Sequence, residues 1–159
     1  MAGIKLEGDW SKLETSLHRM AKINFTALHK EIGEHILSST QERFKTQTGP
    51  DGKEWKKSYR VEKEGGTTLR DTSRLRNSIT VRARPDKVEV GTNDKRARIH
   101  QKGGVIKAKR AKALYFPIGE KFVMKKQVTM PARPYLGLND DDNEAINEII
   151  ADHLEGCLK

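Results

Sequence analysis

The stretch that most constrains this chain runs from Met130 to Leu138 and reads Met-Pro-Ala-Arg-Pro-Tyr-Leu-Gly-Leu. Its two prolines, Pro131 and Pro134, fix φ, remove two backbone donors and push the residues before them out of helical conformation. We therefore expect a rigid, extended strut. Arg133 lies between the two prolines, where its guanidinium is held in position to make a planar contact with a carboxylate or with a row of backbone carbonyls.

The strut leads into a second pattern, in which apolar residues recur at helical spacing from about 145 to 154. Residues 139–141 supply side-chain acceptors that are suited to cap such a helix. We expect the strut to aim this C-terminal helix at a partner, with Arg133 and Tyr135 at the contact and with Tyr135 also buried in the fold. The alternative is an ordinary connector between a strand and a helix, in which Arg133 is a solvated charge.

Apolar residues at helical spacing also predict helix over roughly 9–46, as one long helix or as two. Asp9 is a suitable cap for its start, and Asn24 can cap a second segment. Before this helix, residues 4–7 alternate like a short edge strand. The histidines of the region lack the i, i+4 spacing that stacks two imidazoles as metal ligands, so no metal site is predicted from His18, His29 and His35.

The helical pattern stops after Phe44, where residues 50–52 have the sequence of a tight turn and Trp55 is expected to fold that turn back onto the helix. The polar segment 56–68 is expected to be an exposed loop. A short helical turn capped by Asp71 or Thr72 should follow.

Several strand-like segments lie between that turn and the strut. Alternating residues over 79–90, broken by Pro85-Asp86, predict a β-hairpin. Residues 113–118 are typical of a buried strand, and 121–125 should return beside it. Residues 128–130 lead into the strut.

His100 and Gln101 precede a double glycine, Gly103-Gly104, and a histidine in such a place invites a catalytic interpretation. No serine, cysteine or carboxylate accompanies His100 in a recognisable nucleophile or metal arrangement. We interpret it as a structural histidine bonded to backbone at a sheet edge. No enzymatic activity and no cofactor are predicted.

Charge is distributed unevenly along this chain, whose net charge is +9. The segment 95–112 holds eight basic residues and no acidic one, whereas 140–155 holds seven acidic residues and no lysine or arginine. A basic segment is typical of nucleic-acid binding, but a basic loop and an acidic helix can equally be two halves of a head-to-tail contact between identical subunits. For that contact we predict Lys107, Lys109 and Arg110 on one side and Asp140, Asp141 and Asp142 on the other.

Length and composition limit the class of protein. The 159 residues fit one domain, 1–159, with exposed loops near 56–68 and 95–112, and the 35% hydrophobic content predicts a lean core that needs a partner. No apolar run approaches the roughly 20 residues of a membrane span, and the start of the chain lacks the apolar segment of a signal peptide. We expect a soluble protein made in the cytoplasm. The single cysteine, Cys157, excludes an intrachain disulfide.

Four groups of residues follow one another along the chain: first Phe44, Pro50, Asp51, Gly52 and Trp55; then Leu69, Arg70, Asp71, Thr72, Leu75, Ser78 and Ile79; then Val90, Gly91, Thr92, Ile99, His100, Gln101, Gly103 and Gly104; and last Pro131, Ala132, Arg133, Pro134, Tyr135, Leu136 and Gly137. Together they resemble the phage virion morphogenesis family, also called the tail completion proteins of Mu-like phages. The resemblance covers roughly residues 40–150. Two departures are that Ser73 stands where the family usually has glycine, and that the insert at 107–112 is longer and more basic than expected.

The resemblance implies a small α+β protein. The residue patterns agree with that class and predict a long N-terminal helix, unbroken or in two parts, and a C-terminal helix packed on a small, mainly antiparallel sheet. The resemblance also implies a structural virion protein that forms a ring, expected to be hexameric, at the head-proximal end of the tail or in the neck. That ring would complete the tail and join it to the head, with the tail tube or the connector as partners. The alternative is a basic nucleic-acid-binding protein that uses the segment 95–112.

Overall fold

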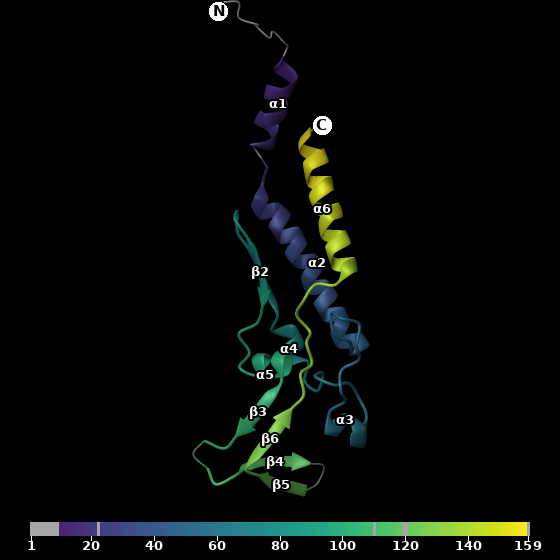
Figure 1. Ribbon diagram of the computed structural model, residues 1–159, viewed down its shortest axis with the longest axis vertical. Coiled ribbons are helices and arrows are strands. Elements are labelled where there is room, and N and C mark those ends of the chain that lie inside the picture. The colour runs from purple at the N-terminus through teal and green to yellow at the C-terminus, as the bar shows by residue number, and fades with distance from the viewer. Residues whose placement is uncertain (1–9, 22, 110, 119–120, 159) are drawn as a thin grey trace, which may run out of the picture.

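The computed structural model describes residues 10–21, 23–109, 111–118 and 121–158. The strand expected at 4–7, the cap at Asp9 and the contact residue Arg110 lie outside the described residues. The molecule is elongated, with the first helix near one end of its long axis and two strand ribbons at the other (Figure 1). The middle holds the two longest helices and the core.

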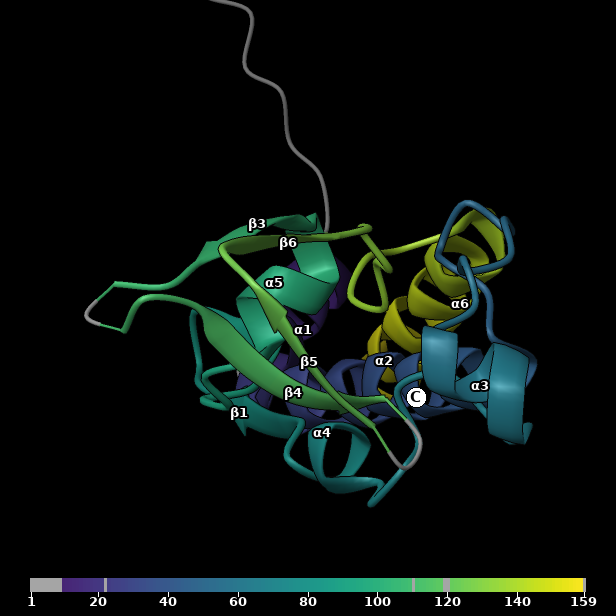
Figure 2. The same cartoon turned by 90° about the horizontal axis from the view of Figure 1, so that it is seen from below.

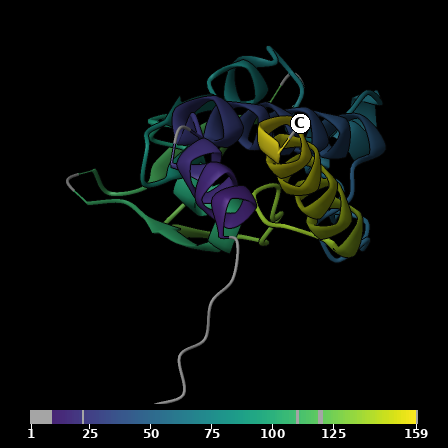
Figure 3. The same cartoon turned by 90° about the horizontal axis from the view of Figure 1, so that it is seen from above.

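The N-terminal helical region forms two helices, which is one of the two predicted arrangements and the one that Asn24 can cap. Helix α1 (Ser11–Met20) and helix α2 (Phe25–Thr46) are separated by a short break, and the Asn24 side chain accepts a hydrogen bond from the backbone N–H of Ala27 at 3.1 Å. The C-terminal helix α6 (Asp140–Leu158) lies along α2 and beside α1 (Figure 3). Its predicted cap is confirmed, because Asn139 Oδ1 accepts from the N–H of Asp142 at 2.8 Å.

The strands form three antiparallel ribbons of two strands each. Strand β1 (Thr80–Ala83) pairs with β2 (Val88–Gly91), β3 (Gly104–Lys107) with β6 (Gln127–Met130), and β4 (Leu114–Ile118) with β5 (Lys121–Lys125). The α+β class is confirmed, and so are the predicted hairpin and the return of 121–125 beside 113–118. One small sheet was expected, and the difference has a structural reason: short helices lie between the first ribbon and the other two (Figure 1).

Three short helices complete the fold. Helix α3 (Tyr59–Glu64) and helix α5 (Ala97–Lys102) lie in the segments 56–68 and 95–112, where exposed loops were expected. The Ser58 hydroxyl caps α3 by accepting from the N–H of Val61. Helix α4 (Arg74–Asn77) begins after Ser73 rather than after the predicted caps Asp71 or Thr72, and the Ser73 side chain makes no capping hydrogen bond.

The core is built around one aromatic cluster. Phe44 contacts the Trp55 ring edge-on, with 5.4 Å between ring centroids, and the Tyr135 ring at 5.2 Å. Leu75 and Ile79 complete the buried group. The predicted tight turn brings Trp55 to this place: the N–H of Gly52 bonds the carbonyl of Gly49 at 3.0 Å, and Gly52 has a φ of +72°.

Ser73 adopts a left-handed backbone conformation, with φ of +53°. For a residue with a Cβ atom this conformation costs roughly 1–2 kcal/mol, which exceeds the extra unfolded-state entropy of glycine, about 0.5–1 kcal/mol. Ser73→Gly is therefore expected to raise the free energy of unfolding by about 0.5–1 kcal/mol, as measured by urea denaturation. This strain also gives a physical reason for the glycine expected at this position.

Gln47 provides the matched control for that prediction, since its φ of +63° is nearly the same. Its side chain donates to the carbonyls of Phe44 and Thr68 and accepts from the N–H of Thr68. Gln47→Gly relieves the same strain but removes these bonds, so it should lower stability. A Ser73→Gly variant no more stable than the natural chain would show that the backbone there relaxes without glycine.

Candidate assembly interface

The strut is extended, as predicted, and neighbouring segments hold it in place. The N–H of Arg133 donates to the carbonyl of His100 at 2.7 Å, and the indole N–H of Trp55 donates to the carbonyl of Pro134 at 2.8 Å. Gln101 Oε1 accepts from the backbone N–H of Tyr135 at 3.0 Å and of Leu136 at 3.1 Å, and its Nε2 donates to the carbonyl of Leu136 at 2.7 Å. The strut is therefore a fixed connection rather than a loose connector.

His100 does not play the part predicted for it. It lies in helix α5 rather than at a sheet edge, and its backbone carbonyl, not its ring, binds the strut. Its Nδ1 atom is buried without a hydrogen-bond partner among the described residues. Burial lowers the pKa of His100, and the nearby charges of Arg133 and Arg96 lower it further. The residue that binds the strut backbone is its neighbour Gln101.

Arg133 makes the planar contact with backbone carbonyls that was predicted, but inside its own chain. Its Nε donates to the carbonyl of Lys56 at 2.7 Å and its Nη2 to that of Lys57 at 3.3 Å. The residue is only 3% exposed. Arg133 thus ties the strut to the segment after Trp55, and it is unavailable for a contact with another subunit.

A second arginine, which sequence reasoning missed, anchors the far end of the strut. Arg43 of α2 donates to the carbonyls of Gly137 at 2.6 Å and Tyr135 at 3.2 Å, and it forms a buried ion pair with Asp142 of α6. The signal was its position: residues 40, 43 and 44 continue the buried stripe of α2 at helical spacing. A charged residue on such a stripe requires a partner.

Asp142 receives several polar contacts at the start of α6. Its carboxylate also accepts from the N–H of Asn139 at 3.1 Å, and Oδ1 lies 3.3 Å from Nε2 of His35. Burial alone would raise the pKa of Asp142, but hydrogen bonds from Ser39 and from the Asn139 backbone, together with the charge of Arg43, hold it below its ordinary value. The aspartate is therefore ionised in the folded chain.

These observations correct the predicted interface. Arg133, Tyr135 and Asp142 are buried in the chain itself, because each of them is needed to hold the strut or the core. Lys107, Lys109, Asp140 and Asp141 have exposed side chains, and for them the interface stays a prediction.

The ribbons β3–β6 and β4–β5 form a projecting unit, residues 104–130, which we call the arm (Figures 1 and 2). Strand β4 was predicted to be buried, and this is wrong: Tyr115 is 67% exposed, as is 74% of Phe122 on the paired strand. Val105 and Met124 are also half exposed or more. The reason is that the arm is a pair of ribbons away from the helices, with no further layer covering this face.

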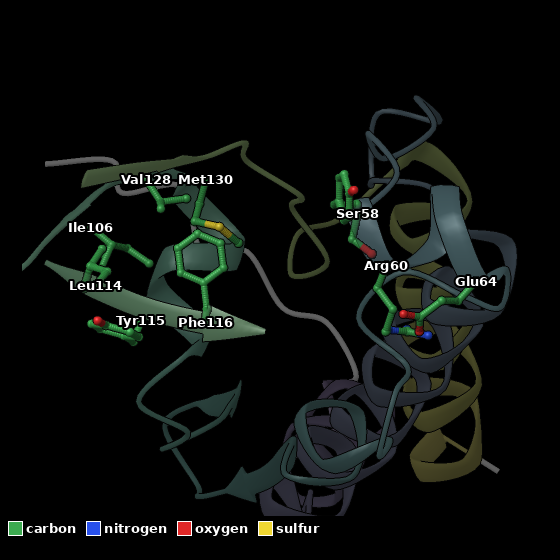
Figure 4. A pocket seen from close by; sticks show the side chains of 10 residues that line it. Ser58, Arg60, Glu64, Ile106, Leu114, Tyr115, Phe116, Val128 and Met130 are labelled. Carbon is green, nitrogen blue, oxygen red and sulfur yellow. The ribbon is translucent and has the colours of Figure 1, made fainter. Parts of the chain in front are cut away.

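An open groove of about 700 Å³ separates the arm from α3 (Figure 4). The arm side of the groove is apolar and the α3 side is mixed, with Arg60 and Glu64 facing the opening. The apolar side chains on the arm side include Ile106, Leu114, Phe116, Val128 and Met130. The arm side of the groove is thus an accessible apolar wall beside a partly charged helix.

Charge separates along the molecule in the same way as along the sequence. Among the side chains that the structure describes, the arm exposes five lysines, Lys107, Lys109, Lys112, Lys125 and Lys126. Helix α6 exposes six carboxylates, Asp140, Asp141, Glu144, Glu148, Asp152 and Glu155. The arm and α6 occupy different parts of the long axis (Figure 1), so these opposite charges do not neutralise one another within one chain.

Residues 9–155 match the sequence profile of the phage virion morphogenesis family. The chain belongs to this family. A relative from Haemophilus influenzae, "Mu-like prophage FluMu G protein 2", is 31% identical over 150 residues, which cover 93% of each chain. No solved structure matches the chain. Family membership gives this virion morphogenesis protein a structural role in building the phage particle.

The strut of this phage virion morphogenesis protein fixes the position of the arm, with its groove and lysines, relative to the helices. Within the part of the chain that is described, none of the helices is long and apolar enough to cross a membrane.

Proposed function

We propose that this protein forms a homo-oligomeric ring at the head-proximal end of the phage tail or in the neck, where it completes the tail and enables the tail to join the head. The observation that carries the proposal is the arm, which combines exposed aromatic side chains, an apolar groove and five lysines on one rigidly held unit. The partners are further copies of the chain and the proteins of the tail tube or the connector.

Two physical arguments support an assembly role. Tyr115, Phe122 and Met124 are each more than half exposed and lie together on one ribbon, and clustered exposed apolar side chains are typical of a surface that contacts another protein. The separation of charge between the arm and α6 favours a head-to-tail contact between copies. In such a contact the basic arm of one copy attracts the acidic helix α6 of the next copy.

Electron microscopy of phage particles tests the proposal directly. A phage that lacks this gene product should release filled heads and separate tails, and a label fused to this protein should lie at the junction between head and tail in complete particles. Joined particles in normal number from the phage that lacks the protein would overturn the proposal, as would a label found on the capsid shell.

Reversing charge on the arm should weaken assembly. Lys107→Glu with Lys109→Glu removes two positive charges and adds two negative ones, so repulsion between the arm and α6 of the next copy replaces attraction. We expect the oligomer of this variant to dissociate at a lower salt concentration than the oligomer of the natural protein, as measured by sedimentation velocity. Lys45→Glu with Lys53→Glu makes the same change of charge away from the arm and should leave assembly as it is.

The same variants separate assembly from DNA binding. If the natural protein shifts a short DNA duplex at moderate salt, and the arm variant abolishes that shift while it still assembles, the arm faces nucleic acid rather than a neighbouring subunit. If assembly is lost and no duplex binds either protein, the arm is a protein contact.

A further inference from the structure

Helix α1 carries an apolar face that the described part of its own chain leaves exposed. Trp10, Leu13 and Leu17 are each half exposed or more, and their spacing places them on one side of the helix. Between Trp10 and Arg19, Ser16 is the one residue that is even partly buried. A helix of ten residues is marginal in water on its own, and although α6 packs beside α1, this apolar face stays exposed and is open to a further contact.

The groove offers a matching surface at the opposite end of the molecule. Its arm side is a concave apolar wall, whereas α1 is a convex apolar ridge, and Figure 1 places the two at opposite ends of the long axis. The helix of one chain therefore cannot enter the groove of the same chain. Ten helical residues extend about 15 Å, and amphipathic helices of this kind bind other proteins by laying an apolar face in an apolar groove.

Charge indicates that the occupant is a second copy of this chain. Helix α6 lies beside α1 and exposes its carboxylates along that end of the molecule (Figure 3). The groove lies beside the lysines of the arm. One end thus joins an apolar ridge to negative charge, and the other joins an apolar groove to positive charge. Both properties are complementary in a head-to-tail pair.

We propose that α1 of one copy docks in the groove of the next copy, with the carboxylates of α6 facing the lysines of the arm. The inference rests on the proposed function in one respect, namely that the chain assembles with itself. A contact between two different patches is heterologous, so each copy retains one free helix and one free groove, and the series closes into a ring when the rotation per step permits.

Two variants, each defective in one half of the contact, test this arrangement. Leu13→Asp with Leu17→Asp places charge on the α1 ridge, and Ile106→Asp places charge in the groove. Each protein alone should assemble at least about tenfold more weakly than the natural chain, because charge enters the apolar centre of the contact. Leu138→Asp changes an exposed apolar residue that belongs neither to α1 nor to the arm and its groove, so it is the matched control and should assemble normally.

Mixing the two defective proteins is the decisive step. The groove of the α1 variant and the helix of the groove variant are both intact, so an equimolar mixture should form dimers that do not grow further. Melting curves confirm that each variant is folded, and Ile106→Thr offers a milder groove variant should Ile106→Asp fail to fold.

Three outcomes would overturn the inference: normal assembly of both variants, a mixture that stays monomeric, or a natural protein that is monomeric at all concentrations. Normal assembly of the variants would leave the proposed place at the head–tail junction intact, since microscopy of particles tests that place independently.

Discussion

Replacing Tyr135 with alanine is expected to lower the free energy of unfolding by about 3–5 kcal/mol. The side chain is fully buried and contacts Phe44, which in turn contacts Trp55, so alanine leaves a cavity at the centre of the aromatic cluster. Urea denaturation of the purified protein measures the effect. A loss below about 1 kcal/mol would mean that the strut moves inward to fill the space.

Tyr135→Phe isolates the ring from its hydroxyl. The Tyr135 hydroxyl oxygen is buried without a hydrogen-bond partner in the described structure, and burial raises the pKa of this phenol to about 12. Removing an unsatisfied buried hydroxyl costs little, so phenylalanine should be neutral or slightly stabilising. Strong destabilisation by phenylalanine would instead show that the hydroxyl has a partner in the assembled protein.

Asp142→Ala is expected to cost about 3–5 kcal/mol, because it leaves the buried guanidinium of Arg43 without its carboxylate. The adjacent residue gives a matched control: Asp141 has the same chemistry and an exposed side chain, so Asp141→Ala should change stability by less than about 0.5 kcal/mol. Replacing both partners, with Arg43→Met and Asp142→Leu, should recover part of the loss, since no buried charge then remains.

The same ion pair predicts a dependence on pH. The pKa of Asp142 is lower in the folded chain than in the unfolded chain, so its contribution is complete above the unfolded value of about 3.9 and is lost as the pH falls toward the folded value. The natural protein should therefore lose more stability than the Asp142→Ala variant when both are acidified from pH 5 to pH 3. If the free energy of unfolding falls equally with pH in the two proteins, the Arg43–Asp142 ion pair does not control stability in acid.

Local patterns were sufficient to predict much of the fold. Proline positions fixed the strut, Asn24 marked the break between two helices, and alternation around Pro85-Asp86 predicted the hairpin. In each case the physical cause lies within a few residues of its effect. The same holds for the turn that carries Trp55 into the core.

The features that were not predicted depend on contacts between distant segments. The sequence does not say which of three consecutive aspartates faces inward, because that depends on where Arg43 lies on α2, 99 positions earlier. Helix α3 has no apolar stripe and is short, so its polar sequence is typical of a loop. The continuous apolar run at 114–118 is the same for a buried strand and for an exposed one, and only the absence of a covering layer among the described residues distinguishes them.

The arm begins and ends at one point of the core, because Gly104 and Met130 are direct partners in the β3–β6 ribbon. Gly103 makes this junction compact: a Cβ atom there would come within 2.7 Å of the backbone nitrogen of Ala132. Lengthening a chain segment whose ends are already held together costs only about 0.6 kcal/mol for each doubling. Insertions and changes of charge in the arm therefore have little effect on the folding stability of the rest of the chain. A segment such as 107–112 can vary in length or charge at this junction without altering the helices.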